Sequence, residues 1–131
     1  MIVVDTSVII AVITREPGAS AFIQLMTDAR HLSAPASSIL EASIALRRKF
    51  RSSAALDGFV GSFRVGVTAI DSVVAHLARA ADAQFGRATG HQARLNFGDC
   101  LSYAVAKHLG APLLYKGNDF VHTDIESALP A

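Results

Sequence analysis

Apolar residues along the chain occur in short continuous runs that alternate with stripes at helical spacing. The first run, at residues 2–4, is β-branched and stops at Asp5, which is the pattern of a central parallel strand buried on both faces. Thr6 or Ser7 is then positioned to cap the helix that follows. Similar short runs predict strands at residues 31–34, 65–70 and 113–115, and the tail could add an edge strand at 123–125.

Helices are predicted where apolar side chains recur at i, i+3 and i+4. After the first, the predicted helices begin after Gly18, at Ser37 or Ser38, at residue 54, at Asp71 and after Asn96. The apolar stripe of the third helix extends to Phe50. The last helix carries Asp99 in its first turn and ends at Gly110 and Pro112.

The segment 86–98 contains Gly90 and Gly98 and shows no periodicity, so we interpret it as a loop. In a parallel sheet built from alternating strands and helices, the helix after a strand runs back to the amino edge, where the strands begin. The loop must then carry the chain to the carboxyl edge, where the strands end. About 11 extended residues reach ~35 Å, which exceeds the ~22 Å length of a helix of about 15 residues. Asp99 is therefore expected to begin its helix at the carboxyl edge of the sheet.

This alternation of strands and helices predicts an α/β fold, a three-layer α/β/α domain with a mainly parallel central sheet of four to five strands. A chain of 131 residues is long enough for a substantial core, and residues 1–131 are expected to form a single domain. The hydrophobic share of 51% and the charged share of 18% exclude a disordered or fibrous protein.

The net charge of +1 predicts neither nucleic acid nor membrane as a partner, so any site for a polyanion must be local. A secretory signal and a membrane span are not expected, because the chain opens directly on a strand and its apolar runs are short. The single cysteine, Cys100, fits a reducing cytoplasm and is interpreted as a small buried helix residue.

Four carboxylates are expected to meet at the carboxyl edge of the sheet, where such folds bind ligands. Asp5 ends the first strand, Glu41 lies early in the helix after the second, Asp99 opens a returned helix and Asp119 follows a later strand. Carboxylates that share a site repel one another unless a cation neutralises them. Oxygen ligands of this kind suit Mg²⁺ or Mn²⁺, and one or two such ions can hydrolyse a phosphodiester bond.

Other charged residues modify this interpretation only slightly. Zinc is not expected, because the five histidines show no zinc-type spacing: His31, His76, His91, His108 and His122. The third helix ends in a basic cluster of Arg47, Arg48, Lys49 and Arg51, which fits either a solvated helix end or a patch that contacts phosphate.

Four segments together resemble the PIN-domain proteins of the VapC toxin type. They are residues 2–7 (IVVDTS), 38–42 (SILEA), 97–104 (FGDCLSYA) and 113–120 (LLYKGNDF), so the resemblance covers nearly the whole chain. It implies an endoribonuclease that depends on Mg²⁺ or Mn²⁺ and forms the toxin half of a toxin–antitoxin pair. It also implies a homodimer that a VapB antitoxin silences by binding over the acidic site.

The resemblance carries the family's acidic positions onto Asp5, Glu41, Asp99 and Asp119, with Asp5 and Asp99 binding the metal most directly. Thr6 or Ser7 matches the small hydroxyl residue that helps to order the site. Asp124 lies five residues after Asp119 and could share or take the fourth role. Arg47, Arg48 or Arg94 would contact the RNA phosphates.

Two other functions remain open from the sequence. A phosphatase of the haloacid-dehalogenase type also begins with a strand that ends in Asp, although such enzymes carry a second acid where this chain has Ser7. The second is a non-catalytic, metal-binding regulatory module in which Asp5 and Lys116 are only structural.

Overall fold

A computed structural model describes residues 1–129 and contains a four-stranded parallel sheet in the order β3-β2-β1-β4. The strands are β1 (Ile2–Val4), β2 (Leu32–Pro35), β3 (Gly66–Thr68) and β4 (Leu113–Leu114). The predicted parallel sheet is confirmed with four strands. Residues 123–125 form an irregular bend instead of an edge strand, and an isolated bridge joins Ser127 to Leu113.

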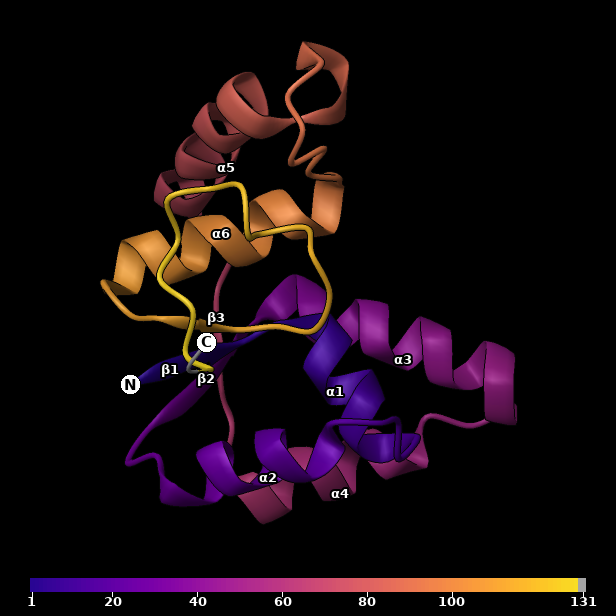
Figure 1. Cartoon of the computed structure of the whole chain (residues 1–131). Coiled ribbons are helices and arrows are strands. Elements are labelled where there is room, and N and C mark those ends of the chain that lie inside the picture. The colour runs from indigo at the N-terminus through magenta and orange to yellow at the C-terminus, as the bar shows by residue number, and fades with distance from the viewer. Residues whose placement is uncertain (130–131) are drawn as a thin grey trace.

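Helices cover both faces of this sheet, as the predicted α/β/α layers require (Figure 1). They are α1 (Thr6–Ile13), α2 (Ala19–Asp28), α3 (Ala36–Phe50), α4 (Ala54–Phe63), α5 (Ser72–Phe85) and α6 (Phe97–Leu109), with a short 3₁₀ helix, η1 (Arg87–Thr89). Helices α5 and α6 pack on one face, and α1 to α4 lie on the other (Figure 1). No helix within residues 1–129 combines the length and the apolar character needed to cross a bilayer.

Side chains of the neighbouring strands β1 and β4 alternate between two cores, because successive residues of a strand point to opposite faces. Val3 and Leu113 belong to the core under α5 and α6. Val4 and Leu114 belong to the core shared with α1 to α4. All four side chains are fully buried, which explains why β1 appears in the sequence as an uninterrupted apolar run.

Two predicted helix caps are wrong. Asp5 caps α1 by accepting a hydrogen bond from the backbone N–H of Ser7, so Thr6 and Ser7 already lie inside the helix. Helix α3 begins directly after Pro35, and no side chain caps it, although Ser37 or Ser38 was the expected cap. The fixed φ of proline starts this helix without a capping side chain. Phe50, which the pattern places in the buried stripe of α3, is 53% exposed.

The segment between α5 and α6 does not carry the chain along the sheet as predicted. Its two ends lie together, since Leu95 donates a backbone hydrogen bond to Phe85 (3.0 Å) and bridges Gly86. Helix α5 packs along α6 and itself brings the chain to the point where α6 begins. The expected position of α6 is correct, but a helix provides the return and not an extended loop.

The direction in which new strands are added to the sheet reverses at β1. The chain builds β2 and β3 on one side of β1 and then places β4 on the other. In open parallel sheets this reversal leaves a crevice at the carboxyl ends of the two strands on either side of it, and ligands bind there. The ends of β1 and β4 therefore mark the position at which a functional site is expected.

Candidate active site at the carboxyl edge of the sheet

Asp5 occupies the end of β1 and is held by three hydrogen bonds. Its Oδ2 accepts from the backbone N–H and the hydroxyl of Ser7, at 3.1 and 2.6 Å, and its Oδ1 accepts from the Ser102 hydroxyl at 2.5 Å. Asp5 is only 6% exposed. These donors come from α1 and α6, so the two helices fix one carboxylate between them.

Glu41 reaches the same edge from α3. Its Oε1 accepts a hydrogen bond from the hydroxyl of Thr6 at 2.9 Å. Its carboxylate packs against Gly98 in the first turn of α6, where a methyl group added to the glycine Cα would lie 2.7 Å from Oε1 and closer still to Oε2. Burial raises the pKa of Glu41, and the negative charge of Asp5 raises it further.

Asp99 lies in the first turn of α6 and completes a capping box with Asn96. Its backbone N–H donates to Asn96 Oδ1 at 2.8 Å, and its own Oδ2 accepts from the Asn96 N–H at 3.1 Å. Burial raises the pKa of Asp99 to about 7, and the neighbouring carboxyls of Asp119 and Asp5 add to this rise. Asp119 itself is exposed in the turn after β4.

The four predicted acids thus lie at one edge and influence one another. Asp5 acts electrostatically on both Glu41 and Asp99, and Asp119 lies beside Asp99. Within residues 1–129 no three acidic, histidine or cysteine side chains are close enough to form a ready-made metal cage. Mg²⁺ needs only one or two carboxylates because it keeps several waters, so this repelling, oxygen-only set fits such an ion.

Asp124, the alternative fourth acid, has different partners. Its carboxylate accepts hydrogen bonds from the Tyr103 hydroxyl (2.5 Å) and from Lys107 Nζ (2.9 Å), and these contacts lower its pKa. They join the C-terminal tail to α6. Asp119, and not Asp124, has a carboxyl beside Asp99.

The predicted basic residues lie on the surface. Arg47 and Arg48 are exposed in the last turn of α3, about two turns beyond Glu41. Arg94 is exposed in the loop before α6 and has a positive φ. Cys100 is buried, and desolvation raises the pKa of its thiol to about 11, which disfavours the reactive thiolate.

The sequence-based prediction misses two contacts of the site, between Ser102 and Asp5 and between Gly98 and Glu41. Ser102 is fully buried and lies one helical turn after Asp99, within an apolar helix, so its spacing was an available signal. Gly98, which the sequence places in the loop, lies inside α6 and leaves room for the Glu41 carboxylate.

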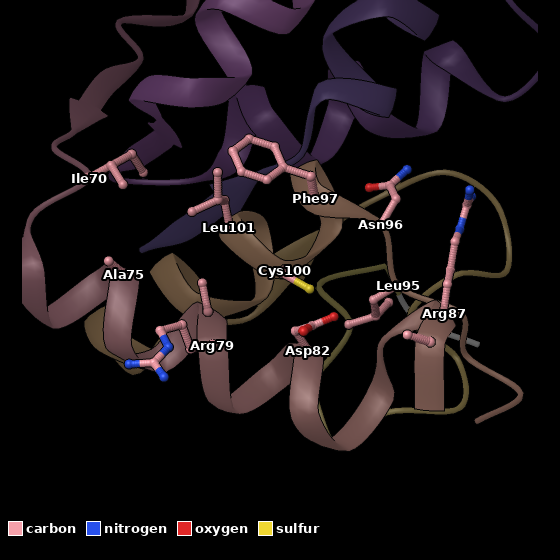
Figure 2. Close-up of a pocket in the computed structure, with 12 residues that line it drawn as sticks. Ile70, Ala75, Arg79, Asp82, Arg87, Leu95, Asn96, Phe97, Cys100 and Leu101 are labelled. Carbon is pink, nitrogen blue, oxygen red and sulfur yellow. The ribbon is translucent and has the colours of Figure 1, made fainter. Parts of the chain in front are cut away.

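A groove of about 760 Å³ opens between α5 and the start of α6. Figure 2 shows Phe97 and Leu101 on α6 near Ile70, while Asp82 on α5 points toward Cys100. Phe97 is 82% exposed, although it directly precedes the Gly98–Asp99 pair. An exposed aromatic side chain thus lines this end of the groove.

Comparison with known proteins gives consistent matches. The family profile described as PIN domain matches residues 2–126. Ribonuclease VapC28 of Mycobacterium tuberculosis is 46% identical over 129 residues, which cover 97% of each chain. The solved structure of VapC20 from M. tuberculosis, described as a toxin that cleaves the sarcin–ricin loop, superimposes with a TM-score of 0.78 at 20% identity over 99% of this chain and 100% of that one. A toxin–antitoxin complex from Klebsiella pneumoniae gives a TM-score of 0.70 at 13% identity, covering 92% of this chain and 90% of that one.

Proposed function

The chain belongs to the PIN-domain family and, within it, to the VapC ribonucleases, and from this premise we propose that it is the endoribonuclease toxin of a toxin–antitoxin pair. Membership in this family confirms the resemblance seen in the sequence. It excludes the alternative that the chain is a phosphatase of the haloacid-dehalogenase type. The observation that carries the proposal is the convergence of Asp5, Asp99 and Asp119 at the switch point of the sheet. RNA phosphodiester bonds are the proposed substrate.

We propose that Asp5 and Asp99 hold a divalent cation, Mg²⁺ or Mn²⁺, and that Glu41 and Asp119 complete its surroundings. Such an ion supplies charge neutralisation and a water of lowered pKa. Ser7 and Ser102 orient the Asp5 carboxylate, while Thr6 and Gly98 position Glu41. Glu41, with its raised pKa, is suited to accept a proton from attacking water.

Removing divalent cations is expected to abolish RNA cleavage by the purified protein. The test compares cleavage of structured and unstructured RNA in Mg²⁺, in Mn²⁺ and in EDTA, followed on denaturing gels. Asp5→Asn should lose the metal-dependent cleavage, whereas Asp124→Asn serves as a matched carboxylate control that keeps it. Equal cleavage by all proteins would indicate a contaminating nuclease, and metal binding without any cleavage would favour a regulatory module.

Exposed residues on the surface suggest where RNA and a second copy of the chain would bind. Arg47, Arg48 and Arg94 are proposed to contact the RNA backbone, since exposed arginines suit phosphate oxygens. A homodimer is proposed from the family, and the exposed Leu40 and Ile44, one turn apart on α3, offer an apolar surface for it. The proposed cytoplasmic location follows from the RNA substrate.

The antitoxin is proposed to bind the groove between α5 and α6 with apolar side chains. Phe97 links this groove to the acidic site, because it is the second residue before Asp99. A protein segment that covers Phe97 would therefore also restrict access to the carboxylates. The lining of the groove includes Arg79 and Arg87, which can pair with acidic residues of such a segment.

Ala75→Arg is expected to weaken inhibition by the cognate antitoxin about tenfold or more, because it places a charge in an apolar contact. Ala75 lines the groove and is exposed, so the free protein should fold and cleave normally. His76→Arg is the matched control, since His76 is exposed on the same helix but does not line the groove. Inhibition titrations measure both variants, and equal inhibition of both would contradict this binding position.

A further inference from the structure

Lys116 is the second residue after β4, at the edge where the acidic residues gather. Its backbone N–H donates to the Ser7 hydroxyl at 3.0 Å, and that hydroxyl donates to Asp5 Oδ2 at 2.6 Å. Asp119, which lies beside Asp99, follows three residues later. The backbone of Lys116 is therefore two hydrogen bonds from Asp5 and belongs to the framework of the site.

The side chain of Lys116 is held by Glu16, which follows α1. Lys116 Nζ lies 2.7 Å from Glu16 Oε1, and the two side chains are 35% and 36% exposed. The other oxygen of Glu16 accepts from the Thr14 hydroxyl at 3.1 Å. Lys49, in the basic last turn of α3, also acts on the Glu16 carboxylate. Glu16 is thus paired with Lys116 and also feels the positive charge at the end of α3.

An ion pair with this exposure contributes little to stability, because water and salt screen its charges and two long side chains must be held in one geometry. Another anion can therefore replace Glu16 as the partner of Lys116 at a small cost in free energy. A cluster of carboxylates repels the phosphates of an RNA backbone, so a substrate needs a cation near the cluster to bring it in. Lys116 can meet this requirement once its flexible side chain leaves Glu16, since its backbone is fixed to the network around Asp5.

On the basis of the proposed RNA cleavage, we propose that Lys116 binds a backbone phosphate of the RNA beside the acidic site, and that Glu16 occupies this cation until RNA displaces it. Glu16 then acts as a competitor that weakens RNA binding in the free protein. The pair would thus tune affinity for RNA without taking part in bond cleavage.

Equilibrium binding tests this proposal, with a fluorescein-labelled single-stranded RNA of mixed sequence, in EDTA, at a series of KCl concentrations. Lys116→Gln should weaken binding several-fold and reduce the slope of log K against log salt by about 0.7, the value for one phosphate of a single strand. Lys116→Arg should restore the slope. Glu16→Gln should tighten binding several-fold. Lys107→Gln, which breaks the other exposed ion pair, should change neither quantity.

The decisive result is opposite effects of Lys116→Gln and Glu16→Gln on RNA affinity together with no effect of Lys107→Gln, since a general change in net charge would act equally in both lysine variants. An unchanged salt slope in Lys116→Gln, or weaker binding in Glu16→Gln, would overturn the proposal. Cleavage assays with metal separate this failure from a failure of the proposed function. A wild-type protein that cleaves RNA while Lys116→Gln keeps its slope refutes only the phosphate contact, whereas no metal-dependent cleavage refutes the ribonuclease itself.

Discussion

Asp99→Asn is expected to reduce RNA cleavage by about 10²-fold or more, the scale on which removal of one catalytic charge acts. The substitution removes a carboxylate charge next to Asp5 and Asp119 but keeps a side-chain oxygen for the capping box with Asn96. The folded structure should therefore persist. Initial rates in Mg²⁺ or Mn²⁺ measure the loss, with Asp124→Asn as the control, and unchanged cleavage would exclude Asp99 from the active site.

The same variant should also remove a pH dependence of stability in EDTA. The pKa of Asp99 is raised from 3.8 to about 7 in the folded state. Between these values the unfolded chain has lost a proton that the folded protein keeps, so the free energy of unfolding falls as the pH rises. Urea unfolding at about pH 5 and about pH 8 should show wild type losing stability relative to Asp99→Asn. Added Mg²⁺ should reverse this loss in wild type only.

Gly98→Ala is expected to reduce cleavage about 10-fold to 100-fold, as loss of a supporting contact does at metal sites. The new methyl group would collide with both carboxylate oxygens of Glu41. Glu41 has a flexible side chain and can move away, so the protein should fold, and alanine favours the helix by up to about 1 kcal/mol over glycine. The expected result is lower activity without a lower melting temperature.

Two variants show whether this effect acts through Glu41. Gly58→Ala is the matched control, because Gly58 is also a helical glycine but has open space around its Cα. Combining Gly98→Ala with Glu41→Gln should cost little more than Glu41→Gln alone, as expected for two changes that act on the same contact. Fully additive losses would show that Gly98 acts independently of Glu41.

The hydrophobic pattern predicted most of the fold because the neighbouring strands β1 and β4 bury side chains on both faces of the sheet. Residues 2–4 and 113–115 are continuous apolar runs, and the structure forms β1 and β4 there. Helix starts were predicted less well. Asp5 caps α1 although it follows a strand directly, and α3 starts after Pro35 without a cap, so hydroxyl residues nearby gave a false signal. The chain returns to the carboxyl edge because α5 packs along α6. This tertiary packing cannot be predicted from the local pattern of apolar residues.

The candidate site was predictable to the extent that strand ends determine it. Asp5 and Asp119 follow β1 and β4, and because these strands are neighbours in the sheet, the strand order alone brings both acids to the same edge. The contacts of Ser102 and Gly98 could not be predicted in the same way, because each depends on a partner far away in the chain. Ser102 meets Asp5 across 97 residues, and Gly98 meets Glu41 from a different helix.

Pairing of β1 with β4 has a consequence for the protein during its synthesis. The first strand made receives its second neighbour only when residues 113–114 have been translated, and Asp119 follows later still. Because these contacts are among the most distant in sequence, they belong to the slow, non-local part of folding. A nascent chain on the ribosome therefore carries Asp5 long before it carries a complete acidic site. The order of translation itself delays nuclease activity until almost the whole polypeptide has been made.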